Sequence, residues 1–120
     1  MSAPPTLYGI PNCDTVKKAR AWLDQRELPY RFHDYKKQGV EAEQITRWVE
    51  EAGWEAVLNR RGTTFRGLPD ALKADLDAHK AVAVMVANPS CIKRPIVEHE
   101  GGLLVGFNPA TWEQALLKRP

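Results

Sequence analysis

The first 35 residues carry a strand-like, then a helix-like, then a second strand-like pattern of hydrophobic positions. Residues 6–10 form a short apolar segment that a Pro-Asn turn ends. Val16, Ala19 and Leu23 then recur at helical spacing, and residues 28–35 alternate and carry aromatic side chains. The pattern predicts a βαβ unit, which implies a parallel strand pair with a right-handed crossover.

The middle of the chain carries mainly helical patterns. Residues 36–39 break the pattern of the second strand. Residues 59–67 are polar and punctuated by glycine, so they are predicted as a loop. Apolar residues at helical spacing predict two helices, the first of which ends at Gly53 and is followed by one further turn at residues 56–58. Their apolar positions are Ile45, Trp48, Val49 and Ala52 in the first helix and Leu68, Leu72 and Leu76 in the second, which has Pro69 near its first turn.

Residues 81–88 are ambiguous by periodicity. Their alternating β-branched residues fit a buried strand, whereas their alanines and Met85 fit a buried helix. Pro89 ends the segment in either case.

The last 30 residues predict two strands and a helix. Residues 95–100 and 103–107 read as strands joined by a Gly-Gly turn at Gly101 and Gly102. Asn108 and Pro109 then suit the N-cap and first position of a helix that buries Trp112, Ala115 and Leu116.

The predicted order is β-α-β, a helical middle, then β-β-α. This is an α/β chain with a thioredoxin-like arrangement and a helical insertion. We predict one domain over residues 1–120, with the thioredoxin-like core at about 5–35 and 90–120 and the insertion at about 36–89.

Composition narrows the class of protein. A chain of 120 residues suits one compact domain, and a formal net charge of +2 gives no basic surface for nucleic acid or an anionic membrane. The N-terminal residues show no secretory signal, and the longest apolar run, residues 81–87, is too short to span a bilayer. Two cysteines in such a chain fit a reducing compartment. We therefore expect a cytoplasmic protein that binds neither membrane nor nucleic acid directly.

Cys13 is the strongest candidate for chemistry. With Asn12 as the expected N-cap, Cys13 takes the first position of the helix. Unpaired backbone N–H groups and the positive end of the helix dipole there favour the thiolate, which is the nucleophilic form. Lys17 adds cationic support, whereas Asp14 opposes it. The alternative interpretation is a cysteine that serves as a small core residue.

The residues around Cys13 restrict the type of thiol chemistry. Val16 stands where a Cys-x-x-Cys motif would have its second cysteine, so a one-cysteine redox cycle needs an outside thiol, for which glutathione is the natural choice. A phosphatase loop of the Cys-x5-Arg kind is excluded because position 19 is alanine. Cys91 is interpreted as a small buried hydrophobe, with a resolving cysteine as the alternative.

Arginines supply the candidate anion-binding groups. The Arg94-Pro95 peptide bond, at the entry to a strand, is a candidate cis bond, and Arg94 offers a planar donor fork to an anion held near Cys13. Arg60, Arg61 and Arg66 form a second basic cluster, of which we expect at least two to be merely solvated. The three histidines have no metal-ligand spacing with either cysteine, so no metal is expected.

Four blocks of the chain together resemble the ArsC/Spx family, and most closely its YffB-type branch. They are residues 8–19, which include Cys13, residues 58–65, residues 92–97 with Arg94 and Pro95, and residues 105–108. The resemblance covers nearly the whole chain. It implies a thioredoxin-like fold with a helical insertion, a helix at residues 81–88, Cys13 as the reactive thiol and Arg94 as an anion-binding group beside it.

The resemblance also implies a function. In the arsenate reductases of this family a cysteine thiolate attacks arsenate held by three arginines, and glutathione and glutaredoxin complete the reduction. Here Phe107 and Asn59 stand where two of those arginines lie, with Arg60 or Arg61 displaced by one or two residues. We therefore expect a glutathione-dependent thiol reductase. Its catalytic residue would be Cys13, and its glutathione- or substrate-binding residues Asn12, Thr15, Arg61, Arg94 and Pro95.

Two alternatives remain open. One is an arsenate reductase with a degraded arginine site. The other is an Spx-like regulatory module that binds RNA polymerase without turnover, although the Cys-x-x-Cys switch of many Spx-like proteins is absent here. In each case we expect a monomer, with glutaredoxin as a further partner of the enzyme.

Overall fold

The computed structural model describes residues 4–117, which form two compact units. The first unit combines the chain up to Asp34 with the chain from Arg94 onward, and the second is Tyr35–Lys93. These bounds lie close to those predicted for the core and the insertion. The expectation that residues 1–120 act as one domain stays a prediction.

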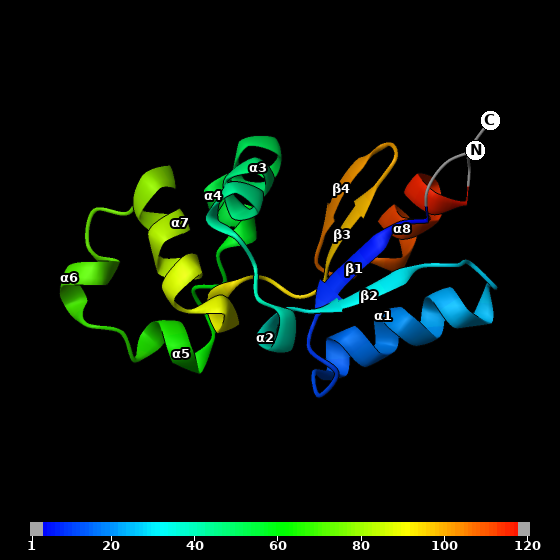
Figure 1. The fold of residues 1–120 in the computed structure, drawn as a ribbon, viewed down its shortest axis with the longest axis horizontal. Coiled ribbons are helices and arrows are strands. Elements are labelled where there is room, and N and C mark those ends of the chain that lie inside the picture. Colours follow the sequence, from blue (N-terminus) through cyan, green and yellow to red (C-terminus); the bar gives the residue numbers. More distant parts are fainter. Residues whose placement is uncertain (1–3, 118–120) are drawn as a thin grey trace. The chain divides into compact units, whose positions relative to one another are not determined.

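A four-stranded sheet organises the first unit (Figure 1). Its strands are β1 (Thr6–Gly9), β2 (Arg31–Asp34), β3 (Ile96–His99) and β4 (Gly102–Val105), in the order β2-β1-β3-β4. β1 is parallel to β2, as predicted, and antiparallel to β3. The turn between β3 and β4 was expected at Gly101 and Gly102, but His99 pairs with Gly102, so the turn residues are Glu100 and Gly101. Gly102 pairs within β4 at a φ of 143°.

Helices α1 (Asp14–Gln25) and α8 (Pro109–Leu116) build the core of this unit. Leu7, Val97 and Leu104 lie opposite one another on adjacent strands and so share one face of the sheet. Both helices pack their apolar residues there, including the almost fully buried Trp112. Asn108 caps α8 as predicted, since its Oδ1 accepts from the Thr111 N–H at 3.2 Å.

The second unit is helical. It contains α2 (Tyr35–Gln38), α3 (Ala42–Ala52), α4 (Trp54–Val57), α5 (Thr63–Arg66), α6 (Asp70–Lys73), α7 (Ala78–Ala87) and the 3-10 turn η1 (Pro89–Cys91). α3 ends at Gly53, whose φ of 90° favours glycine, and α7 confirms the helix implied for residues 81–88. Of the helices between residues 4 and 117, none has the length and hydropathy of a transmembrane span.

The break after the second strand is confirmed, since β2 ends at Asp34. The sequence did not predict the short α2 that follows, which the buried Tyr35 opens; its hydroxyl donates to the Ile92 carbonyl at 3.5 Å. Two local predictions in this unit were wrong. The expected loop at 59–67 contains α5, which buries Phe65. The helix expected from Leu68 to Leu76 is only the single turn α6, since Asp75 takes a φ of 51° and Asp77 already caps α7.

Candidate functional site around Cys13

Cys13 itself is the N-cap of α1, with φ −87° and ψ 126°. Its carbonyl accepts the first helical hydrogen bond, from the Lys17 N–H at 2.9 Å, and its own N–H donates to the Ile10 carbonyl at 3.4 Å. The expectation that Asn12 caps the helix was therefore wrong by one residue, because Asn12 lies exposed in the preceding turn.

This shift changes what the thiol faces. An N-cap side chain normally accepts from the N–H groups of the second or third helical residue, here Thr15 and Val16. The Cys13 side chain makes no such capping bond. As the N-cap, Cys13 directly precedes these N–H groups, and a thiolate at this position can accept a hydrogen bond from them.

Glycine and core packing hold the cysteine in place. A Cβ on Gly9 would lie only 2.8 Å from Cγ2 of the buried Val16, so the end of β1 approaches α1 more closely than an alanine would allow. Cys13 is half-buried, packs against the core cluster of this unit and forms no disulfide. Its neighbours Asp14 and Thr15 are exposed. Sequence analysis did not identify Gly9, although a glycine that ends a strand before a Pro-Asn turn was a usable signal.

Arg94 and Pro95 lie at the same end of the sheet as Cys13. The Arg94-Pro95 bond is cis, as predicted. Since Tyr8 pairs with Ile96, these two residues lie beside the end of β1, from which the chain turns to Cys13 (Figure 1). Pro95 is buried, and its carbonyl accepts from the Gly106 N–H at 2.8 Å, whereas Arg94 is half-buried.

Phe107 follows β4 at this end of the sheet and belongs to an aromatic cluster. Its ring lies edge-on to Trp112, with centroids 4.9 Å apart, and to Trp22 at 6.3 Å. The Trp112 indole donates to the Gly106 carbonyl at 3.1 Å, which fixes the segment before Phe107. Position 107 therefore provides packing and no hydrogen-bond donor side chain.

The second basic cluster belongs to the helical unit. The Arg60 guanidinium lies 5.3 Å from the centroid of the Trp54 ring, and the Arg61 N–H donates to Asn59 Oδ1 at 3.1 Å. The Arg61 and Arg66 side chains are both exposed. The binding role expected for Arg61 stays a prediction.

Cys91 is only 1% exposed, lies in the same helical unit and forms no disulfide. Its carbonyl accepts from the Asn59 N–H at 2.7 Å. These surroundings are those of a packing residue. Within residues 4–117 no three His, Cys, Asp or Glu side chains are arranged to hold a metal ion.

Known proteins are similar to this chain in both sequence and fold. A solved structure of a protein named YFFB is 55% identical, with a TM-score of 0.91, over 93% of this chain and 98% of that one. An arsenate reductase (ArsC) related protein from Brucella melitensis is 50% identical, with a TM-score of 0.76, over 99% of this chain and 98% of that one.

Regulators are among the relatives as well. The global transcriptional regulator Spx of Listeria innocua is 32% identical over 109 residues, which cover 86% of this chain and 79% of the regulator. The model of the ArsC family matches residues 8–115. The chain therefore belongs to the ArsC family and has its thioredoxin-like fold.

Proposed function

We propose that this protein is a glutathione-dependent thiol–disulfide reductase in which Cys13 is the nucleophile. The observation that carries the proposal is the position of Cys13, a half-exposed N-cap without a capping hydrogen bond, at the sheet end that also holds Arg94 and Pro95. Helix N-termini stabilise thiolates, and the thiolate is the reactive form.

The proposed cycle needs one protein thiol and two exchange steps. The Cys13 thiolate attacks the glutathione sulfur of a mixed disulfide, so a Cys13–glutathione bond forms and the substrate thiolate leaves and takes up a proton. The thiolate of a second glutathione then attacks the glutathione sulfur of that adduct. Oxidised glutathione leaves and Cys13 returns as the thiolate. In sum, the mixed disulfide and one glutathione thiol give the substrate thiol and oxidised glutathione, and the proton of that glutathione balances the one that the substrate thiolate takes up.

The residues around Cys13 have distinct proposed roles. The first backbone N–H groups of α1 and the Thr15 hydroxyl donate to the thiolate and to the departing sulfur. Arg94 offers its guanidinium fork to a glutathione carboxylate, and Pro95 and Asn12 line the peptide part of the ligand. Arg61 is the proposed second contact to a carboxylate. The buried Cys91 takes no part.

Arsenate reduction is a second candidate activity, with weaker support than thiol–disulfide reduction. It is suggested by the relative described as arsenate reductase related. Against it, Phe107 offers an aromatic ring instead of a donor, and each missing hydrogen bond to a charged oxyanion costs about 1.5–3 kcal/mol. Arsenate-dependent oxidation of glutathione at millimolar arsenate would support this activity, and its absence would exclude it.

A regulatory role is the alternative from another class of protein. It is favoured by the 32% identity to Spx. Under this alternative the chain binds RNA polymerase, and co-purification with the polymerase is unchanged in Cys13→Ser. If a tagged wild-type protein does not co-purify with RNA polymerase, the regulatory alternative is excluded.

Turnover tests the leading proposal. The purified protein is supplied with the mixed disulfide of glutathione and 2-mercaptoethanol, excess glutathione, glutathione reductase and NADPH, and NADPH loss is followed. We expect turnover in the wild type and in the control Cys91→Ala, and none in Cys13→Ser. Activity that survives in Cys13→Ser would contradict the proposal.

A further inference from the structure

The Phe107 ring is held in a fixed position but is only partly covered. Its two aromatic partners, Trp22 and Trp112, are 7% and 1% exposed, whereas Phe107 is half-buried. The backbone before Phe107 is fixed on both sides, because the Gly106 N–H donates to the Pro95 carbonyl at 2.8 Å and the Gly106 carbonyl accepts from the Trp112 indole at 3.1 Å. A rigid aromatic surface therefore remains partly accessible after β4.

Phe107 lies at the same end of the sheet as Cys13 and on the same face. β4 is antiparallel to β3, and β3 is antiparallel to β1, so β4 and β1 run in the same direction. Phe107 follows the end of β4 and Cys13 follows the end of β1 (Figure 1). Both side chains pack against the core cluster that α1 and α8 form with the sheet. The two residues therefore border the same region of the first unit.

The leaving thiol of the proposed cycle has the reach to contact Phe107. Adjacent strands lie about 4.8 Å apart, so β1 and β4, with β3 between them, are separated by about 10 Å. When Cys13 attacks the glutathione sulfur, the leaving sulfur is two S–S bonds away, about 4 Å from the Cys13 sulfur. A ring carried beyond that sulfur meets another ring at a centroid distance of about 4.5–7 Å. These lengths together match the separation of the two strands.

The loops that carry the two residues suit an apolar group. Neither residues 10–12 nor residues 106–108 include a charged side chain. Ile10 is half-buried and Pro11 is exposed, and Asp34, at the end of β2, lies on the other side of β1 from β4. A charged leaving group would find no opposite charge in these loops, whereas an apolar group buries surface against Phe107.

We infer that Phe107 is the specificity-determining residue for the thiol that Cys13 releases, and that this thiol carries an aromatic group. In the exchange step, the bond between the leaving sulfur and the glutathione sulfur breaks and the Cys13–glutathione bond forms. The leaving thiolate departs with its aromatic group against Phe107 and takes up a proton. The inference rests on the proposed reductase activity and adds the chemical class of its substrate.

Two mixed disulfides of glutathione test the inference, one with benzyl mercaptan and one with 2-mercaptoethanol. Both leaving thiols are primary alkyl thiols, so their intrinsic reactivities are similar and the ratio of the two kcat/KM values measures recognition. We expect the wild type to prefer the benzyl disulfide about tenfold, which is the gain that one partly buried aromatic contact gives. Phe107→Ala should lower the ratio to about one, and Phe107→Leu should give an intermediate ratio.

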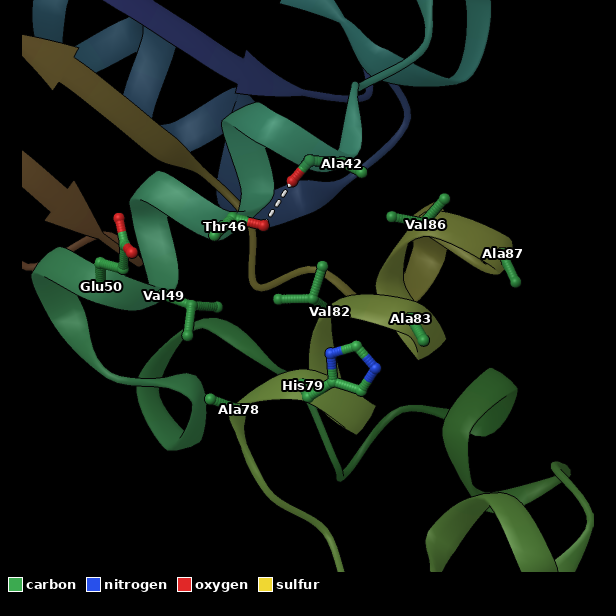
Figure 2. Close-up of a pocket in the computed structure, with 10 residues that line it drawn as sticks. All are labelled: Ala42, Thr46, Val49, Glu50, Ala78, His79, Val82, Ala83, Val86 and Ala87. Carbon is green, nitrogen blue, oxygen red and sulfur yellow. Dashed lines mark hydrogen bonds between the residues drawn. The ribbon is translucent and has the colours of Figure 1, made fainter.

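Two controls separate recognition by Phe107 from lost packing and from adhesion to apolar surfaces. Tyr30→Ala truncates another half-buried aromatic residue on the same core cluster, but before β2, at the opposite end of the sheet. Val86→Ser changes an exposed residue on the outer face of α7, in the groove between α3 and α7 of the helical unit (Figure 2). Both variants should keep the wild-type ratio, and circular dichroism verifies that each variant is folded.

Thioether analogues measure the same recognition without turnover. In S-phenethyl glutathione a methylene group replaces the leaving sulfur of the benzyl disulfide, and S-hydroxypropyl glutathione is the corresponding analogue of the hydroxyethyl disulfide. Calorimetric titration of the wild type should show binding of the phenethyl analogue that is tighter by about tenfold. Phe107→Ala should bind the two analogues equally.

The two readouts separate failure of this inference from failure of the proposed function. Turnover of both disulfides with a ratio near one, or a ratio that Phe107→Ala leaves unchanged, would overturn the inference and keep the reductase activity. Selective binding of the phenethyl analogue by a protein that turns over neither disulfide would support recognition by Phe107 and contradict the reductase proposal. A protein with neither turnover nor selective binding would overturn both.

Discussion

At the scale of single residues, the proposed chemistry depends on one sulfur atom and the groups placed around it. Cys13 occupies the N-cap position of α1, next to backbone N–H groups that have no partner within the helix. Gly9 allows β1 to end close to α1, which holds Cys13 in this position. The reactive residue was identifiable from sequence, because a cysteine between a strand and a helix has a readable pattern. Its capping position was not, because Asn12 is by type the better cap and only the backbone turn decides between the two.

Gly9→Ala should destabilise the protein by about 1–3 kcal/mol, since its Cβ would overlap Val16. Urea unfolding followed by fluorescence measures the change. Gly101→Ala is the control: its nearest foreign atom belongs to the His99 side chain at 3.2 Å, which can move, so we expect a much smaller loss. Equal losses in the two variants would mean that Gly9 does not set the approach of β1 to α1.

Arg94→Gln should raise the KM for glutathione about tenfold with little change in kcat, as expected for loss of one charge-assisted contact to a carboxylate. Arg94→Lys should recover part of the loss. Arg31→Gln, at the opposite end of the sheet where Arg31 pairs with Thr6, should leave KM unchanged. Steady-state kinetics at varied glutathione concentration measure KM for each variant. An unchanged KM in Arg94→Gln would show that Arg94 does not bind glutathione.

At the scale of elements, sequence patterns were reliable where a segment was long or had a clear cap. The strands, α1, α3 and α8 follow from periodicity, and Asn108 with Pro109 marked the start of α8. The four-residue helices α2, α5 and α6 were missed or overextended, because one turn has no period to detect. Each depends on context instead: buried Tyr35 and Phe65 anchor two of them, and Asp75 ends the third.

Asn108→Ala should cost about 1 kcal/mol of stability, because Asn108 Oδ1 accepts from the Thr111 N–H. Asn12→Ala should cost little, since Asn12 is exposed and does not cap α1. Thermal unfolding of both variants compares the two asparagines directly. A larger loss for Asn12→Ala would restore it as the cap of α1.

At the scale of the whole molecule, the chain is a thioredoxin-like sheet unit interrupted by a helical unit. Element order predicted a βαβ segment and a ββα segment, and the strands of both segments lie in one sheet. The apolar outer face of α7 was also present in the sequence, in the ambiguity of residues 81–88 between buried strand and buried helix. Sequence alone could not reveal that this helix is buried on one side only.

The prediction of one cooperative domain can be tested with the tryptophans. Trp22 and Trp112 report on the sheet unit, and Trp48 and Trp54 on the helical unit. We expect far-UV circular dichroism and fluorescence to give coincident urea transitions in Trp22→Phe/Trp112→Phe and likewise in Trp48→Phe/Trp54→Phe. Separated transitions within either variant would show that the two units unfold independently.

The most direct test of the central claim is peptide mass spectrometry after the protein has reacted with oxidised glutathione. We predict a single glutathione adduct, located on Cys13 and absent from the buried Cys91, that reduced glutathione removes. A protein that forms no adduct on Cys13 would contradict the account, because a thiol that does not exchange with glutathione cannot carry the proposed cycle.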